Sequence, residues 1–334
     1  MRPVKVLVTG IAGFIGFHTA LRLAERGDEV IGIDNLNDYY PVSLKQARLS
    51  LLGNRVRFRE MDIAEAEAFN ALVQAEQPDV IVHLAAQAGV RYSLENPFAY
   101  AKSNLMGHLS VLEACRRSEG LTHLVYASSS SVYGDNRKVP FSETDRVDAP
   151  KSLYAASKRA DELMSTAYAS LYGLKQIGLR FFTVYGTWGR PDMAYWIFTQ
   201  SVLEGRPIRL FNNGDMMRDF THVDDIVSGV VSTVTAPVFR PGEHPHRVYN
   251  IGNNRPSKLI ELVRLIEEHT GCEAKISYAP MQPGDVVSTY ADIEDMRADY
   301  GFRPTTSLAD GLKEFVGWYR DYAGYAARAA QAVA

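Results

Sequence analysis

The stretch "KVLVTGIAGFIGFH" (residues 5–18) carries an apolar run straight into three glycines spaced three residues apart. The apolar run predicts a buried strand, and the residues from Phe14 onward predict a helix. Gly10, Gly13 and Gly16 allow a tight turn between the two, and they let backbone N–H groups at the start of the helix approach a pyrophosphate. This stretch therefore predicts a strand, a glycine turn and a helix that together bind a dinucleotide.

The second apolar run, "EVIGID" (29–34), supports this interpretation because it ends in an acidic residue at the distance that dinucleotide-binding units show. At the end of the second strand, the Asp34 carboxylate would accept hydrogen bonds from both ribose hydroxyls and would repel a 2′-phosphate. These two signals favour NAD over NADP. A glycine-rich turn that serves only packing is the alternative.

Further apolar runs follow with helical segments between them, and they are apolar throughout rather than alternating. This is typical of parallel strands that helices cover on both faces. The helix over 257–271 is expected to be capped and to end at Gly271. The fold class is therefore α/β, a doubly wound parallel Rossmann sheet with a smaller C-terminal α/β substrate-binding lobe. We expect strands over 56–62, 79–86, 122–128, 176–182 and 248–252, helices over 191–205 and 257–271, and a strand and turn over 208–215.

The composition excludes several other classes of protein. Hydrophobic residues make up 46% and charged residues 22% of the 334 residues, as in ordinary globular proteins. The net charge of −3, with Lys and Arg spread along the chain, gives no sign of a nucleic-acid-binding surface. We find no apolar run of about 18 residues and no signal-peptide core, so we expect no membrane partner. Cys115 and Cys272 lie far apart without metal-ligand spacing, which predicts no metal site and a reducing, cytoplasmic location.

The catalytic chemistry is predicted by two later segments, "YASSSSVYG" (126–134) and "SLYAASK" (152–158). Tyr154 and Lys158 lie four residues apart in a strongly helical stretch, so they share one helix face. The Lys158 ammonium, together with the positive nicotinamide ring of an oxidised cofactor, favours the phenolate of Tyr154 and makes it a candidate general base. A surface tyrosine and lysine would be the alternative.

The four serines of the first segment end the predicted fifth strand, at the carboxyl edge where α/β sheets place ligands. A serine hydroxyl there would hydrogen-bond the same substrate oxygen that Tyr154 deprotonates. If the strand persists that far, Ser129 and Ser131 face one side and Ser130 faces the other. An ordinary polar turn is the alternative.

Together these segments resemble the extended short-chain dehydrogenase/reductase superfamily, and within it the UDP-glucuronate 4-epimerases. The glycine turn and the Tyr-x-x-x-Lys pattern specify only the superfamily. The narrower likeness is carried by "AAQAGVRYSLENP" (85–97) and "FFTVYGTWGRPDM" (181–193), and "RDFTHVDDI" (218–226) is a further matching segment. The likeness spans most of residues 4–226, and "PGDVVSTYAD" (283–292) adds a C-terminal match.

The resemblance implies roles for individual residues. Ser129 would be the catalytic serine, Tyr154 the base and Lys158 its partner. Galactose epimerases usually carry an arginine, a diphosphate contact, where this chain has Gln282. The residues implied to bind substrate are Asn104 near the active site, Arg218 at the diphosphate and Asp285 at the uridine ribose.

A sugar carboxylate is implied by departures from sister enzymes. Where the 4,6-dehydratases carry an Asp-Glu pair and the UDP-glucuronate decarboxylases a Glu, this chain has Ser130 and Ser131, whose hydroxyls can donate to a carboxylate instead of repelling it. Thr183 stands where an asparagine is common and is another small donor. For each arginine in the proposed cradle, a surface role explains the sequence equally well. The cradle is expected to comprise Ser130 or Ser131, Thr183, and Arg91 or Arg190.

The predicted cofactor contacts extend beyond the glycine turn. Asp62 ends the third predicted strand, where its carboxylate could hold the adenine amino group, and a helix N-cap explains this residue equally well. Small residues after the fourth strand let a flat ligand lie close to the backbone. The residues expected to contact NAD are Gly10, Gly13, Phe14, Ile15, Gly16, Asp34, Asn35, Asp62, Ile63, Leu84, Ala85, Ala86, Tyr154 and Lys158.

The resemblance implies an epimerase that interconverts UDP-glucuronate and UDP-galacturonate. It would oxidise sugar C4 with NAD, let the 4-keto intermediate rotate, and reduce it again. The alternatives are a UDP-glucuronate decarboxylase and a neutral UDP-hexose 4-epimerase. A non-catalytic NAD-binding regulator is a remote alternative, which would lack Tyr154 or Lys158, whereas both are present.

The looser pattern after about Arg180 predicts two lobes, and apolar helices suggest a dimer, which the resemblance also implies. We expect residues 1–182, with 219–252 returning, to bind NAD, and residues 183–218 and 253–334 to bind the UDP-sugar. A homodimer is expected to form through helices around 97–118 and 152–172, although their apolar residues could equally all face the sheet.

Overall fold

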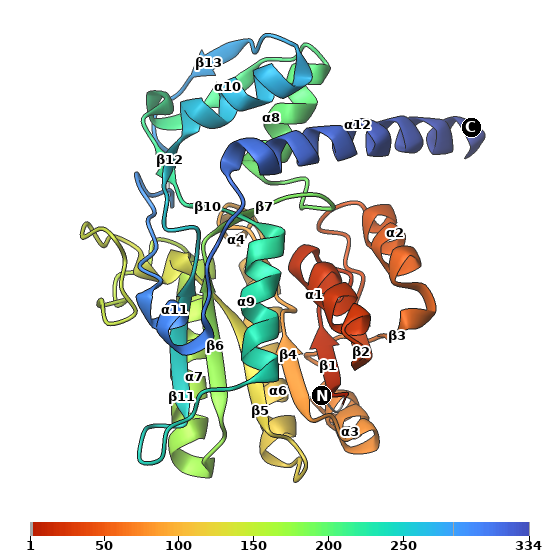
Figure 1. Cartoon of the computed structure of the whole chain (residues 1–334), viewed down its shortest axis with the longest axis vertical. Helices are drawn as coiled ribbons and strands as arrows, with labels where there is room; N and C mark the ends of the chain where they lie inside the picture. The colour runs from red at the N-terminus through yellow and green to blue at the C-terminus, as the bar shows by residue number, and fades with distance from the viewer. Residues whose placement is uncertain (1–2, 283, 334) are drawn as a thin grey trace.

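The computed structural model describes residues 3–282 and 284–333, with side chains up to residue 324. Pro283, which opens the matched stretch 283–292, lies outside the described residues. Figure 1 shows a large α/β unit with a smaller lobe above it, and α12 lies across the top of the larger unit.

Within the described ranges, seven parallel strands form the central sheet in the order β11-β6-β5-β4-β1-β2-β3. Every strand expected for this sheet is present, which confirms the doubly wound parallel fold. The order reverses direction between β1 and β4, and such a switch point opens a crevice beyond the carboxyl ends of the strands. The strands are β1 (Lys5–Thr9), β2 (Glu29–Asp34), β3 (Val56–Glu60), β4 (Val80–His83), β5 (His123–Ser129), β6 (Gln176–Phe181) and β11 (His246–Ile251).

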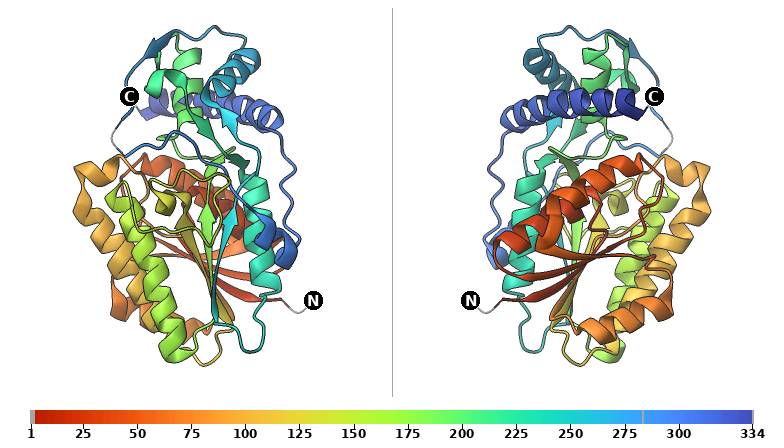
Figure 2. Two further views of the ribbon diagram at one scale, coloured as in Figure 1. Left: turned by 90° about the vertical axis from the view of Figure 1, so that its left-hand side faces the viewer. Right: turned by 90° about the vertical axis from the view of Figure 1, so that its right-hand side faces the viewer.

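Helices cover both faces of the sheet, as the two side views in Figure 2 show. In β1, Val6 and Val8 pack into the core on one face and Leu7 packs into the core on the other. Because both faces are buried, the strands read as unbroken apolar runs. One face carries α1 (Phe14–Glu25) and α9 (Val223–Thr235), and the other carries α3 (Ala66–Glu76), α6 (Gly107–Arg116) and α7 (Leu153–Tyr172).

Helix α7 has well-defined ends, which matters because it holds the predicted catalytic pair. The Ser152 hydroxyl accepts a hydrogen bond from the Ala155 N–H (3.1 Å) and caps the N-terminus. Gly173 follows the last helical residue with a φ of +66°, a conformation that favours glycine. These two signals set the 20-residue helix where the sequence predicts it.

The smaller lobe has its own core of aromatic and aliphatic side chains, including Trp196, Leu262 and Phe315. Its helix α10 ends before Gly271 as predicted, but the predicted N-terminal cap is absent: Lys258 precedes the helix without a side-chain cap. Residues 257–258 pair instead with residues 217–218 as short antiparallel strands. The helices of this lobe are α8 (Ala194–Leu203), α10 (Leu259–Thr270) and α12 (Leu308–Val333), and its strands are β8 (Ile208–Leu210), β9 (Met217–Arg218), β12 (Ser257–Lys258) and β13 (Ile276–Tyr278).

The chain crosses between the lobes more often than the sequence predicts. Helix α11 (Glu294–Tyr300) packs on α9 and β11, and Ile293, Met296 and Phe302 belong to the core of the sheet. The expected lobe boundaries therefore stay a proposal, with residues 291–302 moved to the sheet side. The remaining elements are α2 (Val42–Leu52), η1 (Gly53–Arg55), α4 (Tyr92–Glu95), α5 (Pro97–Tyr100), η2 (Ala101–Met106), η3 (Ser130–Tyr133), β7 (Thr183–Tyr185), η4 (Phe211–Gly214) and β10 (Phe220–His222).

None of the helices in the described part of the chain has the length and apolar character needed to cross a membrane.

Candidate active site

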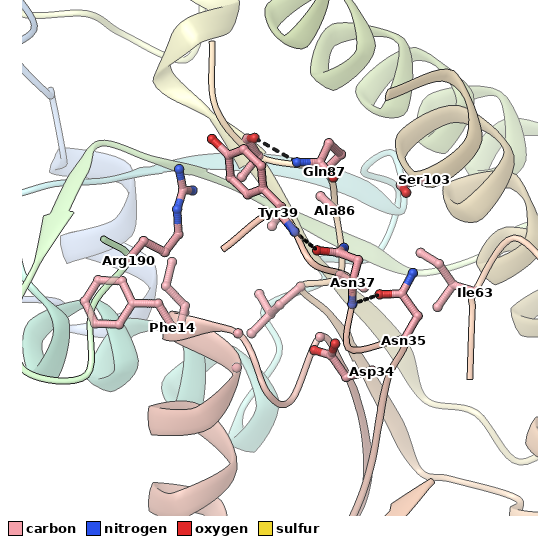
Figure 3. A pocket seen from close by; sticks show the side chains of 18 of the residues that line it. Phe14, Asp34, Asn35, Asn37, Tyr39, Ile63, Ala86, Gln87, Ser103 and Arg190 are labelled. Carbon is pink, nitrogen blue, oxygen red and sulfur yellow. Dashed lines mark hydrogen bonds between the residues drawn. The ribbon is translucent and has the colours of Figure 1, made fainter. Parts of the chain in front are cut away.

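A cavity opens beyond the carboxyl ends of β1, β2, β4 and β5, and the start of α7 closes one of its sides (Figure 3). All of the residues that the sequence predicts to contact NAD line this cavity. The three predicted catalytic residues, Ser129, Tyr154 and Lys158, line it as well. The fold therefore brings together segments that are far apart in the sequence.

The glycine turn lies so close to its neighbours that side chains are excluded from it. A Cβ on Gly16 would lie 2.0 Å from the Gly10 carbonyl oxygen, and a Cβ on Gly10, whose φ is +73°, would lie 2.7 Å from the Ala85 nitrogen. Gly13 is the N-cap of α1 and has no side chain to bond the first N–H groups of the helix. These N–H groups remain for an anion such as a pyrophosphate.

Asp34 organises the wall next to the glycine turn. One carboxylate oxygen accepts a hydrogen bond from the Ala12 N–H (3.1 Å), and the other accepts one from the Leu36 N–H (2.9 Å). Burial raises the pKa of Asp34, while nearby Lys45 acts in the opposite direction. Each carboxylate oxygen has a second lone pair, so Asp34 can still accept hydrogen bonds from a ribose.

Asp62 lines the cavity but does not cap a helix. Its Oδ1 accepts a hydrogen bond from the Ala64 N–H (3.0 Å), whereas the N-cap of α3 is Glu65. The N-cap interpretation of Asp62 is therefore wrong. Lys102, which the sequence analysis missed, lies 2.7 Å from Asp62 Oδ2. Burial tends to raise the pKa of Asp62, but the contacts with Lys102 and the hydrogen bond from the Ala64 N–H together outweigh it and the pKa is lowered.

The predicted base and its partner lie in the first turns of α7. Lys158 is buried, and its ammonium donates to the Ala127 carbonyl oxygen (2.9 Å) at the end of β5 and to Asp161 Oδ2 (3.2 Å). The ring of Tyr100 meets the Tyr154 ring edge-on, with centroids 6.1 Å apart. Tyr154 and Lys158 thus sit between the serine end of β5 and the cavity.

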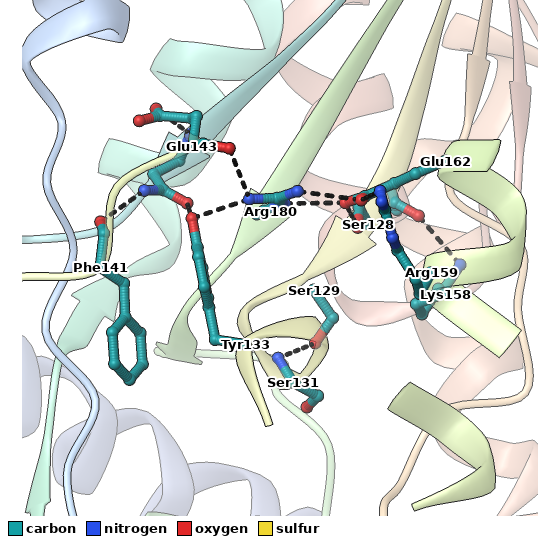
Figure 4. Close-up of polar contacts among 12 residues, drawn as sticks. Ser128, Ser129, Ser131, Tyr133, Phe141, Glu143, Lys158, Arg159, Glu162 and Arg180 are labelled. Carbon is teal, nitrogen blue, oxygen red and sulfur yellow. Dashed lines mark hydrogen bonds and ion pairs between the residues drawn. The ribbon is translucent and has the colours of Figure 1, made fainter. Parts of the chain in front are cut away.

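The serine run divides into residues with different roles. Strand β5 ends at Ser129, and η3 begins at Ser130, so the predicted strand alternation does not extend to Ser130 and Ser131. Ser128 donates to the buried Glu162 of α7 (2.6 Å). The Ser129 hydroxyl accepts a hydrogen bond from the Ser131 N–H (3.1 Å), which holds it at the cavity wall (Figure 4).

Of the predicted carboxylate cradle, Arg190 lines the cavity (Figure 3). Its guanidinium pairs with Asp192 through two contacts, Nε to Oδ1 (3.0 Å) and Nη2 to Oδ2 (2.5 Å). The Tyr39 hydroxyl donates to the same carboxylate (3.0 Å). Thr183, Ser130 and Ser131 are not among the lining residues, whereas Phe182 and Val184, on either side of Thr183, are.

Three predicted substrate residues form what we call the diphosphate cluster: Arg91, Arg218 and Asp285. Arg91 Nη2 lies 3.6 Å from Asp285 Oδ2. Burial lowers the pKa of Arg218, and the neighbouring Asp285 opposes that effect. Arg91, expected at either the carboxylate or the surface, is thus placed beside the two residues expected to hold the nucleotide.

The diphosphate cluster adjoins the cavity through the loop after β4. Gly89, two residues before Arg91, packs so closely on the cavity wall that an added Cβ would lie 2.4 Å from the Tyr39 hydroxyl oxygen. The loop that carries Asp285 packs against this loop after β4, since a Cβ on Gly284 would lie 3.2 Å from Val90. A ligand in the cavity can therefore extend toward the cluster.

The sequence profile of the "NAD dependent epimerase/dehydratase family" matches residues 6–252. The chain belongs to this family. Among its curated relatives, protein CapI of Staphylococcus aureus is 48% identical over 332 residues, covering 96% of this chain and 99% of its own length. UDP-glucuronate 4-epimerase 1 of Arabidopsis thaliana is 47% identical over 338 residues, covering 98% of this chain and 79% of the plant protein.

A solved structure of similar shape confirms the fold of this epimerase-family chain. The UDP-glucuronic acid 4-epimerase from Bacillus cereus, in complex with UDP-glucuronic acid and NAD, superposes with a TM-score of 0.88 at 33% sequence identity. The likeness covers 95% of this chain and 99% of the Bacillus chain. The resemblance to this group, first seen in the motifs, is therefore confirmed.

NAD is the cofactor of this family, and the cavity fits it. The glycine turn offers N–H groups where side chains are sterically excluded, and Asp34 offers acceptor oxygens at the end of β2. These residues would hold the pyrophosphate and the adenosine ribose of the dinucleotide. Leu84, Ala85 and Ala86 would line its path past the end of β4.

In this family member Asn104 is a buried support for segments that line the site. Its side-chain amide accepts from the Gln87 N–H (2.8 Å) and donates to the Gln87 carbonyl (3.2 Å) and to the Ser157 hydroxyl (2.9 Å). Asn104 is buried and is not among the residues that line the cavity. The structure therefore places it as a support for the loop after β4 and for α7, and direct contact with substrate remains a prediction.

A buried polar network beside the serine turn was not predicted from the sequence (Figure 4). Glu162 accepts hydrogen bonds from Ser128 (2.6 Å) and from Arg180 Nε (2.8 Å) and Nη2 (3.0 Å). Arg180 also donates to the Tyr133 hydroxyl (3.0 Å). The signal was present, because Glu162 lies four residues after Lys158 on the same helix face. The network connects α7, β5, β6 and η3, and so supports the end of β5, where Ser129 lies.

Proposed function

We propose that the protein is a UDP-glucuronate 4-epimerase that interconverts UDP-glucuronate and UDP-galacturonate. The observation that carries the proposal is that one cavity unites the glycine turn, the Ser129–Tyr154–Lys158 group and the Arg190 cation. The relatives support it, because the Arabidopsis protein carries this name and the Bacillus enzyme was solved with UDP-glucuronic acid and NAD.

In the proposed reaction, Tyr154 acts on the hydroxyl at sugar C4. The Lys158 ammonium favours the phenolate, which takes the hydroxyl proton, and Ser129 hydrogen-bonds the same oxygen. NAD, when bound, supplies the redox chemistry by accepting the hydride from C4 and returning it later. Tyr154 then gives the proton back to the re-formed hydroxyl, so the enzyme makes no net oxidation.

Inversion requires the sugar to turn while the nucleotide stays bound. We propose that Arg218 and Arg91 hold the diphosphate and that Asp285 accepts from the uridine ribose. Both cations lie in the diphosphate cluster, so the sugar can rotate about its diphosphate linkage without losing these contacts. Arg91 would then provide the second cation that Gln282 does not.

The carboxylate needs restraint because the 4-keto intermediate of a uronic acid is a β-keto acid, which is prone to lose carbon dioxide. We propose that Arg190 binds the sugar carboxylate and keeps its C–C bond out of alignment with the ketone π system. Two-point pairing of a guanidinium with a carboxylate provides the required orientation. The serine part of the cradle is tested by Ser131→Glu, which should cripple turnover of UDP-glucuronate by repulsion; unchanged activity argues against that part.

The products of one incubation test the proposal. UDP-glucuronate is mixed with the enzyme and NAD, without added reductant, and the nucleotide sugars are separated by chromatography. UDP-galacturonate is the expected product. UDP-xylose with carbon dioxide would identify a decarboxylase instead, and conversion of UDP-glucose but not UDP-glucuronate would identify a neutral-sugar epimerase.

We also propose that the enzyme is a homodimer that works in the cytoplasm. Large apolar side chains are exposed on the two expected helical segments, among them Phe98 (83%) and Leu171 (71%). Such a surface is typical of a protein interface. Light scattering should give twice the chain mass, and Leu171→Arg should shift it toward a monomer. A reducing compartment is supported by Cys115 and Cys272, which are both free thiols.

A further inference from the structure

The catalytic lysine faces a buried acid that the reaction does not use. Asp161 lies one turn after Lys158 on α7, and its Oδ2 is 3.2 Å from the lysine Nζ. The side chains of Lys158 and Asp161 are only 4% and 1% exposed. The second carboxylate oxygen, Oδ1, is buried and has no hydrogen-bond partner among the described residues. An unbonded carboxylate oxygen is costly to bury, so this placement calls for a functional explanation.

The neighbouring acid on the same helix does not share the lysine. Glu162 is bonded by Arg180, by Ser128 and by Arg159 Nη1 (3.0 Å). Its negative charge is therefore balanced by two guanidinium groups. Asp161 has only the Lys158 ammonium within ion-pair distance among the described side chains.

The histidine and tyrosine side chains on the elements around the Lys158–Asp161 pair are neutral near pH 7. His83 on β4 and His108 on α6 have pKa values lowered by burial, His83 to about 3. His246 on β11 also has its pKa lowered by burial, to about 4. Tyr126 on β5 keeps its proton because burial raises its pKa. Arg180 on β6 is the remaining cation nearby, and it is bound to Glu162.

We propose that Asp161 is a positioning residue that tunes how strongly Lys158 favours the Tyr154 phenolate, and thereby sets the pH range of the epimerase. When Asp161 is ionised, its negative charge offsets the lysine and opposes the phenolate. When Asp161 is protonated, the lysine charge acts on Tyr154 uncompensated. The inference rests on the proposed function only in assigning Tyr154 as the base.

The environment of Asp161 shifts the pKa of its carboxyl group toward neutral pH. Burial raises the pKa of Asp161 to about 7, and the contact with Lys158 opposes that effect. The carboxyl group therefore changes its charge near neutral pH. As the pH falls, Asp161 takes up a proton and no longer opposes the Tyr154 phenolate. The enzyme would therefore keep more phenolate in acid than it would with a permanent negative charge at position 161.

The variant Asp161→Asn tests the proposal, because asparagine keeps the shape and removes the charge. The acid limb of kcat/KM for UDP-glucuronate should move to lower pH by up to about one unit, with the largest shift where the limb lies above pH 7 and the wild-type Asp161 is ionised. A second readout does not need substrate: the ultraviolet absorbance of the Tyr154 phenolate is titrated as the difference between each protein and its Tyr154→Phe counterpart. Its midpoint should move in the same direction. A midpoint that stays in place or moves to higher pH overturns the proposal.

Two further measurements keep the test decisive. Asp148→Asn removes one charge at an exposed position (63% exposed) and should leave the phenolate midpoint unchanged. If Asp161→Asn fails to fold, Asp161→Ser removes the charge with a smaller side chain and must give the same shift. If the wild-type enzyme does not epimerise UDP-glucuronate, the proposed function fails, while the phenolate titration still decides the role of Asp161.

Discussion

The cofactor side and the substrate side of the active site are built in different ways. The cofactor side, which comprises the glycine turn and Asp34, consists of segments that are close in sequence and are held by backbone contacts. The proposed substrate side comprises Arg190 with Asp192 and the diphosphate cluster, and it is held by ion pairs between side chains. Backbone contacts cannot be exchanged for ligand contacts, whereas an arginine can exchange one carboxylate for another.

This difference separates a fixed half of the site from an exchangeable one. The cofactor side is fixed by backbone contacts. In the Arg190–Asp192 pair, the carboxylate already neutralises part of the arginine charge. Arg190 is the chief cause that lowers the pKa of Asp192, against the opposing effect of burial. A sugar carboxylate must compete with Asp192 for Arg190, so binding by the substrate side depends on a partner exchange.

The largest expected effect lies where the two sides meet. Tyr154→Phe removes the oxygen that, in the proposed reaction, takes the proton of the C4 hydroxyl, and turnover of UDP-glucuronate should fall by about 10³-fold. Binding of UDP-glucuronate, measured by calorimetry, should stay close to that of the wild-type protein. A variant that retains more than a tenth of the wild-type rate would show that another group is the base.

A clash in the cofactor side should remove NAD binding selectively. In Gly16→Ala the new Cβ would lie 2.0 Å from the Gly10 carbonyl oxygen, and the backbone there cannot move without opening the turn. The affinity for NAD, measured by calorimetry, should fall by about 100-fold, on the order of 2.7 kcal/mol.

The matched control for that variant is Gly120→Ala, where the nearest atom to an added Cβ is a side-chain oxygen 3.6 Å away. It should leave NAD affinity unchanged. Equal losses of NAD and UDP affinity in Gly16→Ala would contradict the separation between the two sides.

A smaller and more specific effect is expected on the substrate side. Arg190→Met removes the cation while keeping an extended apolar side chain. The KM for UDP-glucuronate should rise by about 10- to 100-fold, since charge-assisted hydrogen bonds are worth about 1.5–3 kcal/mol. Binding of UDP-glucose, which has no carboxylate, serves as the control and should change little. A uniform loss for both sugars would mean that Arg190 does not recognise the carboxylate.

The smallest expected effect concerns Glu143, a scaffold residue that does not line the cavity. Burial raises the pKa of Glu143 to about 7, and its Oε1 accepts from the Asn250 N–H (2.7 Å). Because the folded pKa lies above the unfolded value, the stabilisation linked to the proton is present in acid and is lost as the pH rises through 7. Glu143→Gln should therefore gain stability relative to wild type between pH 5 and pH 8, by roughly 1 kcal/mol.

Thermal unfolding at several pH values measures this difference. Turnover at pH 7 should stay near the wild-type value, because Glu143 is not among the residues that line the cavity. A large drop in turnover without a change in stability would assign Glu143 to the chemistry instead of the scaffold.

Local patterns in the sequence determined the strands of the sheet, the glycine turn, Asp34 and the shared helix face of Tyr154 and Lys158. Each of these depends on residues that are neighbours along the chain or on the period of a single strand or helix. That the residues expected to contact NAD line one cavity was predictable for the same reason, since the ends of parallel strands meet at one edge.

The tertiary structure decided which charged groups meet. That Lys102 pairs with Asp62 and Arg91 with Asp285 depends on where loops and helices dock. The division of labour within the serine run depended on where β5 ends, which alternation along a strand cannot reveal. Such contacts arise between distant segments, and no periodicity in the sequence records them.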